Sequence, residues 1–230
     1  MVWRGVMTVR QGGGPGGERP VWVQPLMEWP TLEKVRARLD GPTDHVPCEI
    51  GGIALSNAGR QLLACWLEAR GSNAMPCADD VNPRALVELM PYIRYLSWES
   101  EEKLVIRIFG SALAEGAGAD LTGCDIFSPG HAEVEIDRAR LKMLHAQPCG
   151  LLMIRDVHDR GGKTYPCEFM TLPVAPGADG KKRIIGTVVP AARMQCWDAE
   201  VDLDRIFALR RAVYFDTGAG TPEPVPGLEV

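Results

Sequence analysis

Three residues with the capacity to bind a metal, Asp156, His158 and Cys167, lie near the tip of one predicted β-hairpin. In the expected register Cys167 lies opposite Asp156, and His158 follows Asp156 on the same face of its strand. Carboxylate, imidazole and thiolate are all competent ligands for a divalent metal. Polar residues at a strand end are more often ordinary surface, however, so we predict no metal site.

Nucleophilic catalysis and phosphate binding lack their usual components. No serine or cysteine has a base that the sequence can assign to it, and the glycine cluster Gly12 to Gly17 is not followed by the Lys-Ser or Lys-Thr of a P-loop. The 25 basic and 30 acidic residues give a net charge of -5, which lacks the basic footprint of a nucleic-acid-binding protein. We therefore expect no catalytic residues and no nucleic-acid partner.

The composition is that of a folded protein from a reducing compartment. Apolar types make up 46% and charged types 24% of the 230 residues, close to globular averages. The seven cysteines contain no CxxC pair, so we expect reduced thiols. The chain shows neither a signal-peptide core nor an apolar run of ~18 residues, which predicts a cytoplasmic protein without a membrane span.

The first strong periodic segment is a helix from Asn57 to about Arg70. Apolar residues recur on one face at helical spacing, and Gly71 supplies the stop. This wide apolar stripe lies on an element outside the predicted sheet. Its members are Leu62, Leu63, Trp66 and Leu67.

The elements after this helix predict an α+β fold. Five strands are expected, together with short helical turns at 110–124 and a longer helix at about 132–146. Strands in hairpins, separated by one helical block and without βαβ alternation, indicate an antiparallel sheet with helices on one face. The strands are 92–98, 103–109, 151–159, 163–173 and 183–191.

Gly161-Gly162 predicts a two-residue hairpin loop and therefore a register. In that register Arg155 lies opposite Glu168 and Ile154 lies opposite Phe169. An arginine–glutamate pair belongs in solvent, so we expect Ile154 and Phe169 to face inward.

Three regions follow from these elements. Residues 1–56 form an arm and linker rich in glycine and proline, and residues 57–193 form the domain with its leading helix. Residues 194–230 are expected to form an amphipathic helix from Val201 to Val213 and a disordered proline-rich tail.

From Asn57 to Arg193 the chain resembles the PAS domain family, and in particular its largely stand-alone bacterial members. The resemblance is carried by a series of short motifs in a fixed order rather than by one diagnostic motif. These are Leu62-Leu63-Ala64-Cys65-Trp66, Met75-Pro76, Asp80-Val81-Asn82-Pro83, Leu89-Met90-Pro91-Tyr92, Ile106-Arg107-Ile108-Phe109-Gly110 and Asp120-Leu121-Thr122-Gly123.

The resemblance implies a sensory or regulatory module, with a five-stranded sheet and helices over one face. Such domains hold a small ligand between sheet and helices, or pair with a partner. Most are joined to an output domain, and none is recognisable here, so we expect signalling in trans to an unidentified protein. We also expect a homodimer through Leu63, Trp66 and Leu67. The alternatives are a ligand-free protein–protein adaptor and, less favoured, a small hydrolase or lyase on a similar frame.

The expected ligand is small and apolar, in a pocket between the sheet and its helices. Its lining also has the composition of a filled core, and the sequence leaves both interpretations open. The predicted pocket residues are Phe109, Leu113, Phe127, Ile136, Arg140, Leu144, Leu152, Ile154, Phe169, Thr171 and Val188.

No cofactor is assigned. Cys124 lies where flavin photosensors of the family carry an adduct-forming cysteine, but the surrounding box departs from theirs because Asp125 replaces an arginine. His131 and His145 bracket the longer helix, near the axial histidine of heme-binding members. Both are more simply explained as residues of the first and last helical turns.

Overall fold

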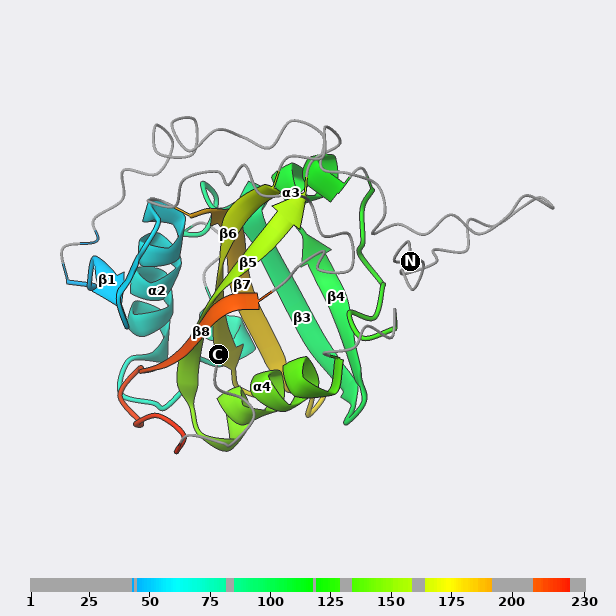
Figure 1. Cartoon of the computed structure of the whole chain (residues 1–230). Helices are drawn as coiled ribbons and strands as arrows, with labels where there is room; N and C mark the ends of the chain where they lie inside the picture. Colours follow the sequence, from blue (N-terminus) through cyan, green and yellow to red (C-terminus); the bar gives the residue numbers. More distant parts are fainter. Residues whose placement is uncertain are drawn as a thin grey trace.

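The computed structural model describes residue Thr43 and the ranges 45–81, 85–117, 119–128, 134–158, 164–191 and 209–223. A six-stranded sheet, antiparallel at every pairing, forms its centre (Figure 1). This architecture confirms the predicted α+β class, with one strand more than expected. Among the described residues no helix is long and apolar enough to cross a membrane.

The strand order in the sheet is β4-β3-β7-β6-β5-β8, so β7 lies between the two hairpins. A separate two-stranded hairpin, β1 (Glu49–Ile50) and β2 (Ile53–Ala54), precedes the first helix. The six strands are β3 (Ile93–Ser100), β4 (Lys103–Phe109), β5 (Cys149–His158), β6 (Thr164–Val174), β7 (Arg183–Pro190) and β8 (Leu209–Asp216).

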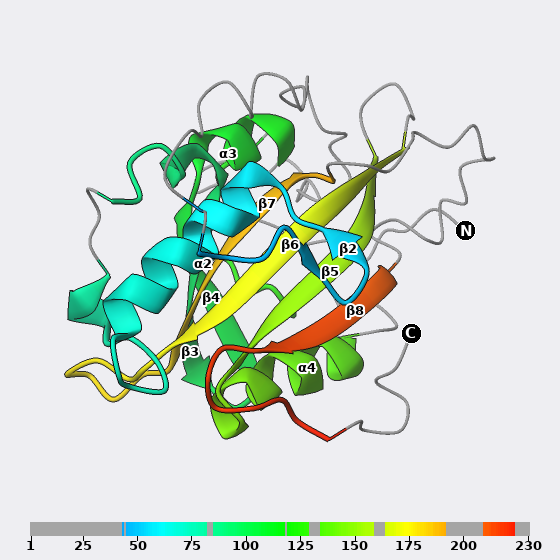
Figure 2. The same ribbon diagram turned by 90° about the vertical axis from the view of Figure 1, so that its left-hand side faces the viewer.

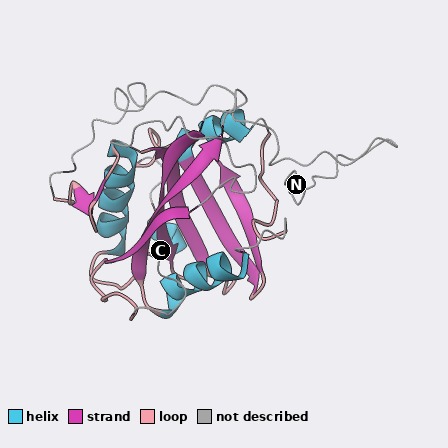
Figure 3. Ribbon diagram, viewed as in Figure 1, coloured by secondary structure: helices cyan, strands magenta, loops and turns pink. Residues whose placement is uncertain are grey.

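Helices cover both faces of the sheet (Figures 2 and 3). Helix α2 (Asn57–Arg70) packs on β6 and β7, whereas α3 (Ser111–Ala117) and α4 (Val134–Ala146) lie on the opposite face. We refer to these as the α2 face and the α4 face. Two short 3-10 turns, η2 (Ala78–Asp80) and η3 (Met90–Tyr92), connect α2 to β3.

Helix α2 has the predicted bounds because its ends are specified locally. Ser56 accepts a hydrogen bond from the backbone N–H of Gly59 at 3.0 Å, the usual role of an N-cap serine. Gly71 ends the helix with φ 53°, in the region that glycine adopts at little cost. Between these ends, Leu62, Leu63 and Trp66 are buried against the sheet.

The expected β5–β6 register is wrong by one residue. The structure pairs Ile154 with Glu168 and His158 with Thr164, which leaves residues 159–163 between the paired ends. A shift of one residue moves every side chain of one strand to the other face of the sheet. Leu152 and Ile154 therefore lie on the α2 face, while Phe169 and Thr171 lie on the α4 face.

The helix expected from Val201 to Val213 is also wrong where the structure can test it. Residues 209–216 form β8, which pairs antiparallel with β5. Val213 and Phe215 join the core on the α2 face, and Ala212 and Tyr214 join the core on the α4 face. Strand β8 therefore extends the sheet by one strand. Residues 201–208 lie outside the described part of the chain.

Candidate functional site

The interior of the α4 face holds a small cavity between the sheet and α4. Its volume is about 70 Å³. By general experience this is room for roughly five water-sized groups. The wall consists of residues from β3, β5, β6, α4 and the segment that precedes α4. These residues are Arg94, Ile126, Phe127, Asp137, Arg140, Leu141, Met153, Arg155 and Phe169.

Arg94 enters this interior from β3. Because side chains alternate along a strand, Arg94 lies on the same face as Leu96 and Trp98, which belong to the core of the α4 face. Gly186 of β7 pairs with Arg94, and a Cβ atom added to Gly186 would lie 3.2 Å from Arg94 Nε and 2.4 Å from the carbonyl oxygen of Met170. Because residue 186 is a glycine, the guanidinium of Arg94 has room to extend over β7 on the α4 face.

The contacts of Arg94 hold its guanidinium beside Phe169. Arg94 Nη2 donates a hydrogen bond to Thr171 Oγ1 at 2.7 Å, and its Cζ lies 5.1 Å from the Phe169 ring centroid, within cation–π range. Burial, followed by the positive charge of Arg155, lowers the pKa of Arg94 to about 10, so the group stays charged at neutral pH.

Asp137 of α4 links the helix to the sheet through two arginines. Its Oδ1 atom accepts a hydrogen bond from Arg140 Nη1 at 3.1 Å and another from Arg155 Nη2 of β5. Arg140 and Arg155 are buried, with 4% and 7% of their surface exposed. Arg155 thus lies in the interior rather than in solvent, where the expected pair with Glu168 would have placed it.

Of the predicted pocket residues, Phe127, Arg140 and Phe169 line the cavity, and Thr171 reaches it through Arg94. Phe109, Leu113 and Val188 lie beside Phe169 in the adjoining cluster of the same face. Leu144 is fully buried in the same face, and Ile136 is partly exposed on α4. The prediction is wrong for Leu152 and Ile154, which lie on the α2 face, on the other side of the sheet from the cavity.

The residues considered for other chemistry lie elsewhere. His145 Nε2 is 2.9 Å from the carbonyl oxygen of Arg183, and burial lowers the pKa of the imidazole. Burial raises the pKa of the Cys124 thiol. Asp156 pairs with Arg210, and the observed register places Cys167 opposite Arg155 rather than Asp156. His131 lies outside the described residues.

The stripe predicted to form a dimer interface is largely inside the protomer. Leu63 and Trp66 are 3% and 2% exposed, and Trp66 Nε1 donates a hydrogen bond to the carbonyl oxygen of Pro173 at 2.7 Å. Leu67 is partly buried beside them. The premise that α2 presents these side chains outward is therefore wrong for Leu63 and Trp66, because α2 folds back on the sheet.

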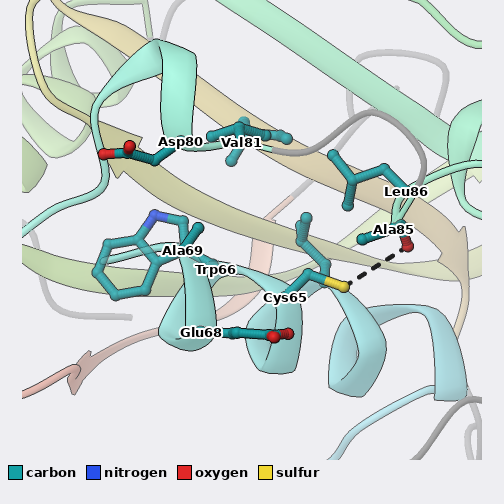
Figure 4. A pocket seen from close by; sticks show the side chains of 10 residues that line it. Cys65, Trp66, Glu68, Ala69, Asp80, Val81, Ala85 and Leu86 are labelled. Carbon is teal, nitrogen blue, oxygen red and sulfur yellow. Dashed lines mark hydrogen bonds between the residues drawn. The ribbon is translucent and has the colours of Figure 1, made fainter. Parts of the chain in front are cut away.

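A second, more open cavity of about 370 Å³ lies between α2 and the segment around η2 (Figure 4). Cys65 Sγ lies 3.7 Å from the carbonyl oxygen of Ala85 at its wall, and burial raises the pKa of that thiol. Its acidic residues, Glu68 and Asp80, are exposed. The α4-face cavity is the better candidate site, because Arg140 and Arg155 are buried and the polar groups of its wall are directed by hydrogen bonds.

Arg94, Asp137 and Arg155 are the site residues that sequence analysis missed. The sequence does carry a signal for Arg94, since it lies two and four residues before the apolar Leu96 and Trp98 in a predicted strand and so shares their face. Asp137 and Arg155 meet only through the packing of α4 on β5 in the observed register, which is a nonlocal arrangement.

Comparison with known proteins identifies a family. A family model described as a PAS domain matches residues 55–189, more than half of the 230-residue chain. The matched range begins at the start of α2 and ends in β7, so it contains the cavity and five of the six strands of the sheet. No curated protein matches the chain.

Proposed function

Because the chain belongs to the PAS domain family, which is one of sensory and regulatory modules, we propose that it binds a small ligand in the α4-face cavity and signals in trans to another protein. The observation that carries this proposal is the cavity itself. It lies between α4 and the sheet, with polar groups held at its wall by hydrogen bonds and ion pairs. A few convergent polar groups in a largely apolar enclosure are typical of small-molecule sites.

Helix α4 connects the cavity to the protein surface, so a bound ligand could change that surface by moving the helix. Asp137, Arg140 and Leu141 face the cavity from this helix, whereas Glu135 and Lys142 are on its solvent side. A ligand that alters the contacts of Asp137 with Arg155 would shift α4 relative to β5. The outer charges of α4 would move with it, and we propose that a partner protein recognises this surface.

The ligand-free adaptor is the second candidate, and the small size of the cavity favours it. Leu121, Leu144 and Leu151 are fully buried on the same face, so most of that interior is already filled. In this alternative the cavity holds only water, and the module acts through its surface. A dimer remains a prediction, and its interface would use residues other than Leu63 and Trp66.

Native mass spectrometry of the full chain separates these functions. The sensor predicts added mass in the native spectrum that is lost on denaturation. The variant Leu141→Phe, which fills the cavity wall, should lose that mass. The same change at the partly buried Leu67 of α2 is the control and should retain it. A wild-type protein without added mass in either state would contradict the sensor and favour the adaptor.

A further inference from the structure

Arg94 is a charged group at the cavity wall whose hydrogen-bonding capacity is only partly satisfied. Its Nη2 donates to the neutral hydroxyl of Thr171, and its Nε atom is buried without a hydrogen-bond partner. Among the described residues, no carboxylate forms an ion pair with Arg94. Asp137, the acidic residue of the cavity wall, attracts Arg94 electrostatically, but its Oδ1 atom accepts hydrogen bonds from Arg140 and Arg155.

This arrangement is unfavourable in isolation. A buried guanidinium whose donors are not all satisfied carries a large desolvation cost, and that cost is reduced when an anion accepts hydrogen bonds from it. The guanidinium presents its donors in a planar fork that fits the two oxygens of a carboxylate. The environment of Arg94 is therefore suited to an anion that the described part of the chain does not supply.

The remaining wall restricts which anion fits. Phe127, Leu141, Met153 and Phe169 surround the cavity with apolar surface. An inorganic phosphate would place polar oxygens against these side chains, and a fully apolar ligand would leave Arg94 Nε without an acceptor. A volume of about 70 Å³ holds roughly five water-sized groups, the size of a carboxylate with a short hydrocarbon tail.

We propose that the α4-face cavity binds a short-chain monocarboxylate, with Arg94 binding the carboxylate group and the apolar wall contacting its tail. This inference rests on the proposed sensory function and specifies its ligand class. The ligand predicted from the sequence is purely apolar. The proposed ligand differs because it carries a carboxylate that binds Arg94 of β3.

The test measures binding of sodium propionate to the full chain by isothermal titration calorimetry, with sodium chloride at equal ionic strength as the reference. Wild-type protein should bind one equivalent, and Arg94→Gln should bind at least tenfold more weakly. Arg94→Lys, which keeps the charge without the planar fork, should lie between them. Arg107→Gln is the matched control, because Arg107 is exposed on β4 and pairs with Glu99. It should bind as the wild type does.

Unchanged propionate affinity in folded Arg94→Gln would overturn the assignment, as would the absence of binding by the wild type. If Arg94→Gln does not fold, propionate binding by the wild type tests the proposal. The ¹³C signal of carboxylate-labelled propionate should broaden on addition of protein and recover on addition of excess acetate. A signal that does not change would contradict the proposal.

The native mass spectrum distinguishes failure of this inference from failure of the proposed function. The protein could retain a ligand that contains no carboxylate and fail to bind propionate. That result would overturn the carboxylate assignment and leave the sensory function in place. No retained ligand, together with no propionate binding, would overturn both.

Discussion

The carboxylate of Glu168 on β6 accepts hydrogen bonds from both the backbone N–H and the hydroxyl of Ser56, each at 2.7 Å. Ser56 is the N-cap of α2, and Glu168 is fully buried. A carboxyl group at a helix N-terminus complements the partial positive charge there. The contact therefore fixes the start of α2 to the centre of the sheet, on the face opposite the cavity.

Glu168 makes the stability of the fold depend on pH. Burial raises the pKa of its carboxyl from 4.5 to about 7, against the lowering effect of the two hydrogen bonds from Ser56. Between these two values the folded protein keeps a proton that the unfolded chain releases. The resulting stabilisation is complete below pH 4.5 and is lost as the pH rises through about 7.

The variant Glu168→Gln removes this titration. From about pH 5 to about pH 8 the free energy of unfolding of the wild type should fall relative to the variant by up to about 3 kcal/mol. Urea unfolding at several pH values measures the difference, in which the titration of His145 cancels because both proteins contain it. The exposed Glu88→Gln is the control. A wild-type minus variant difference that is independent of pH would contradict the prediction.

Asp137 should be a stability residue as well as part of the cavity wall. Asp137→Ala removes a hydrogen-bond acceptor of the buried Arg140 and Arg155, which should cost about 3 kcal/mol in urea unfolding. Glu135→Ala on the same helix removes an exposed pair with Arg138 at the same spacing and should cost less than about 1 kcal/mol. Equal costs for the two variants would show that the interior ion pairs contribute no more than the surface one.

The packing of α2 on its own sheet predicts how its apolar stripe responds to truncation. Leu63→Ala should lower the free energy of unfolding by about 2 to 4 kcal/mol, and Leu67→Ala by less, because only Leu63 is fully buried. Sedimentation velocity of folded Leu63→Ala should equal that of the wild type. A shift from dimer to monomer with unchanged stability would instead restore the dimer interface predicted from the sequence.

Strand β8 predicts a specific steric coupling with β5. A Cβ atom added to Gly150 would lie 2.0 Å from the Phe215 ring, so Gly150→Ala should destabilise the protein by about 1 to 3 kcal/mol. In a Phe215→Leu background the same change should cost at least about 1 kcal/mol less. Additive costs in this double-mutant cycle would contradict the pairing of β8 with β5.

The elements predicted correctly are those whose signals are local. The bounds of α2 follow from its caps and helical apolar period, and the order of strands follows from apolar alternation and turn residues. The PAS family, first indicated by ordered short motifs, matches residues 55–189. Such signals depend on residues close in sequence and do not require knowledge of the packing.

The errors arose where distant segments decide the structure. Residues 209–216 are compatible with a short amphipathic helix, and only pairing with β5 makes them a strand. The β5–β6 register was inferred from two glycines, while the pairing that forms buries Glu168 against Ser56 and Arg155 against Asp137. Both partners are remote in sequence. The register that the two glycines predict therefore places Leu152 and Ile154 on the wrong face.

Ligand binding at Arg94 is tested most sharply by native mass spectra of wild type, Arg94→Gln and Arg107→Gln, purified in parallel without denaturation. Wild type and Arg107→Gln should carry the added mass of a short-chain carboxylate, which is lost on denaturation and absent from Arg94→Gln. Spectra that show only the mass of the chain in all three proteins, or the same added mass in all three, would contradict ligand binding at Arg94.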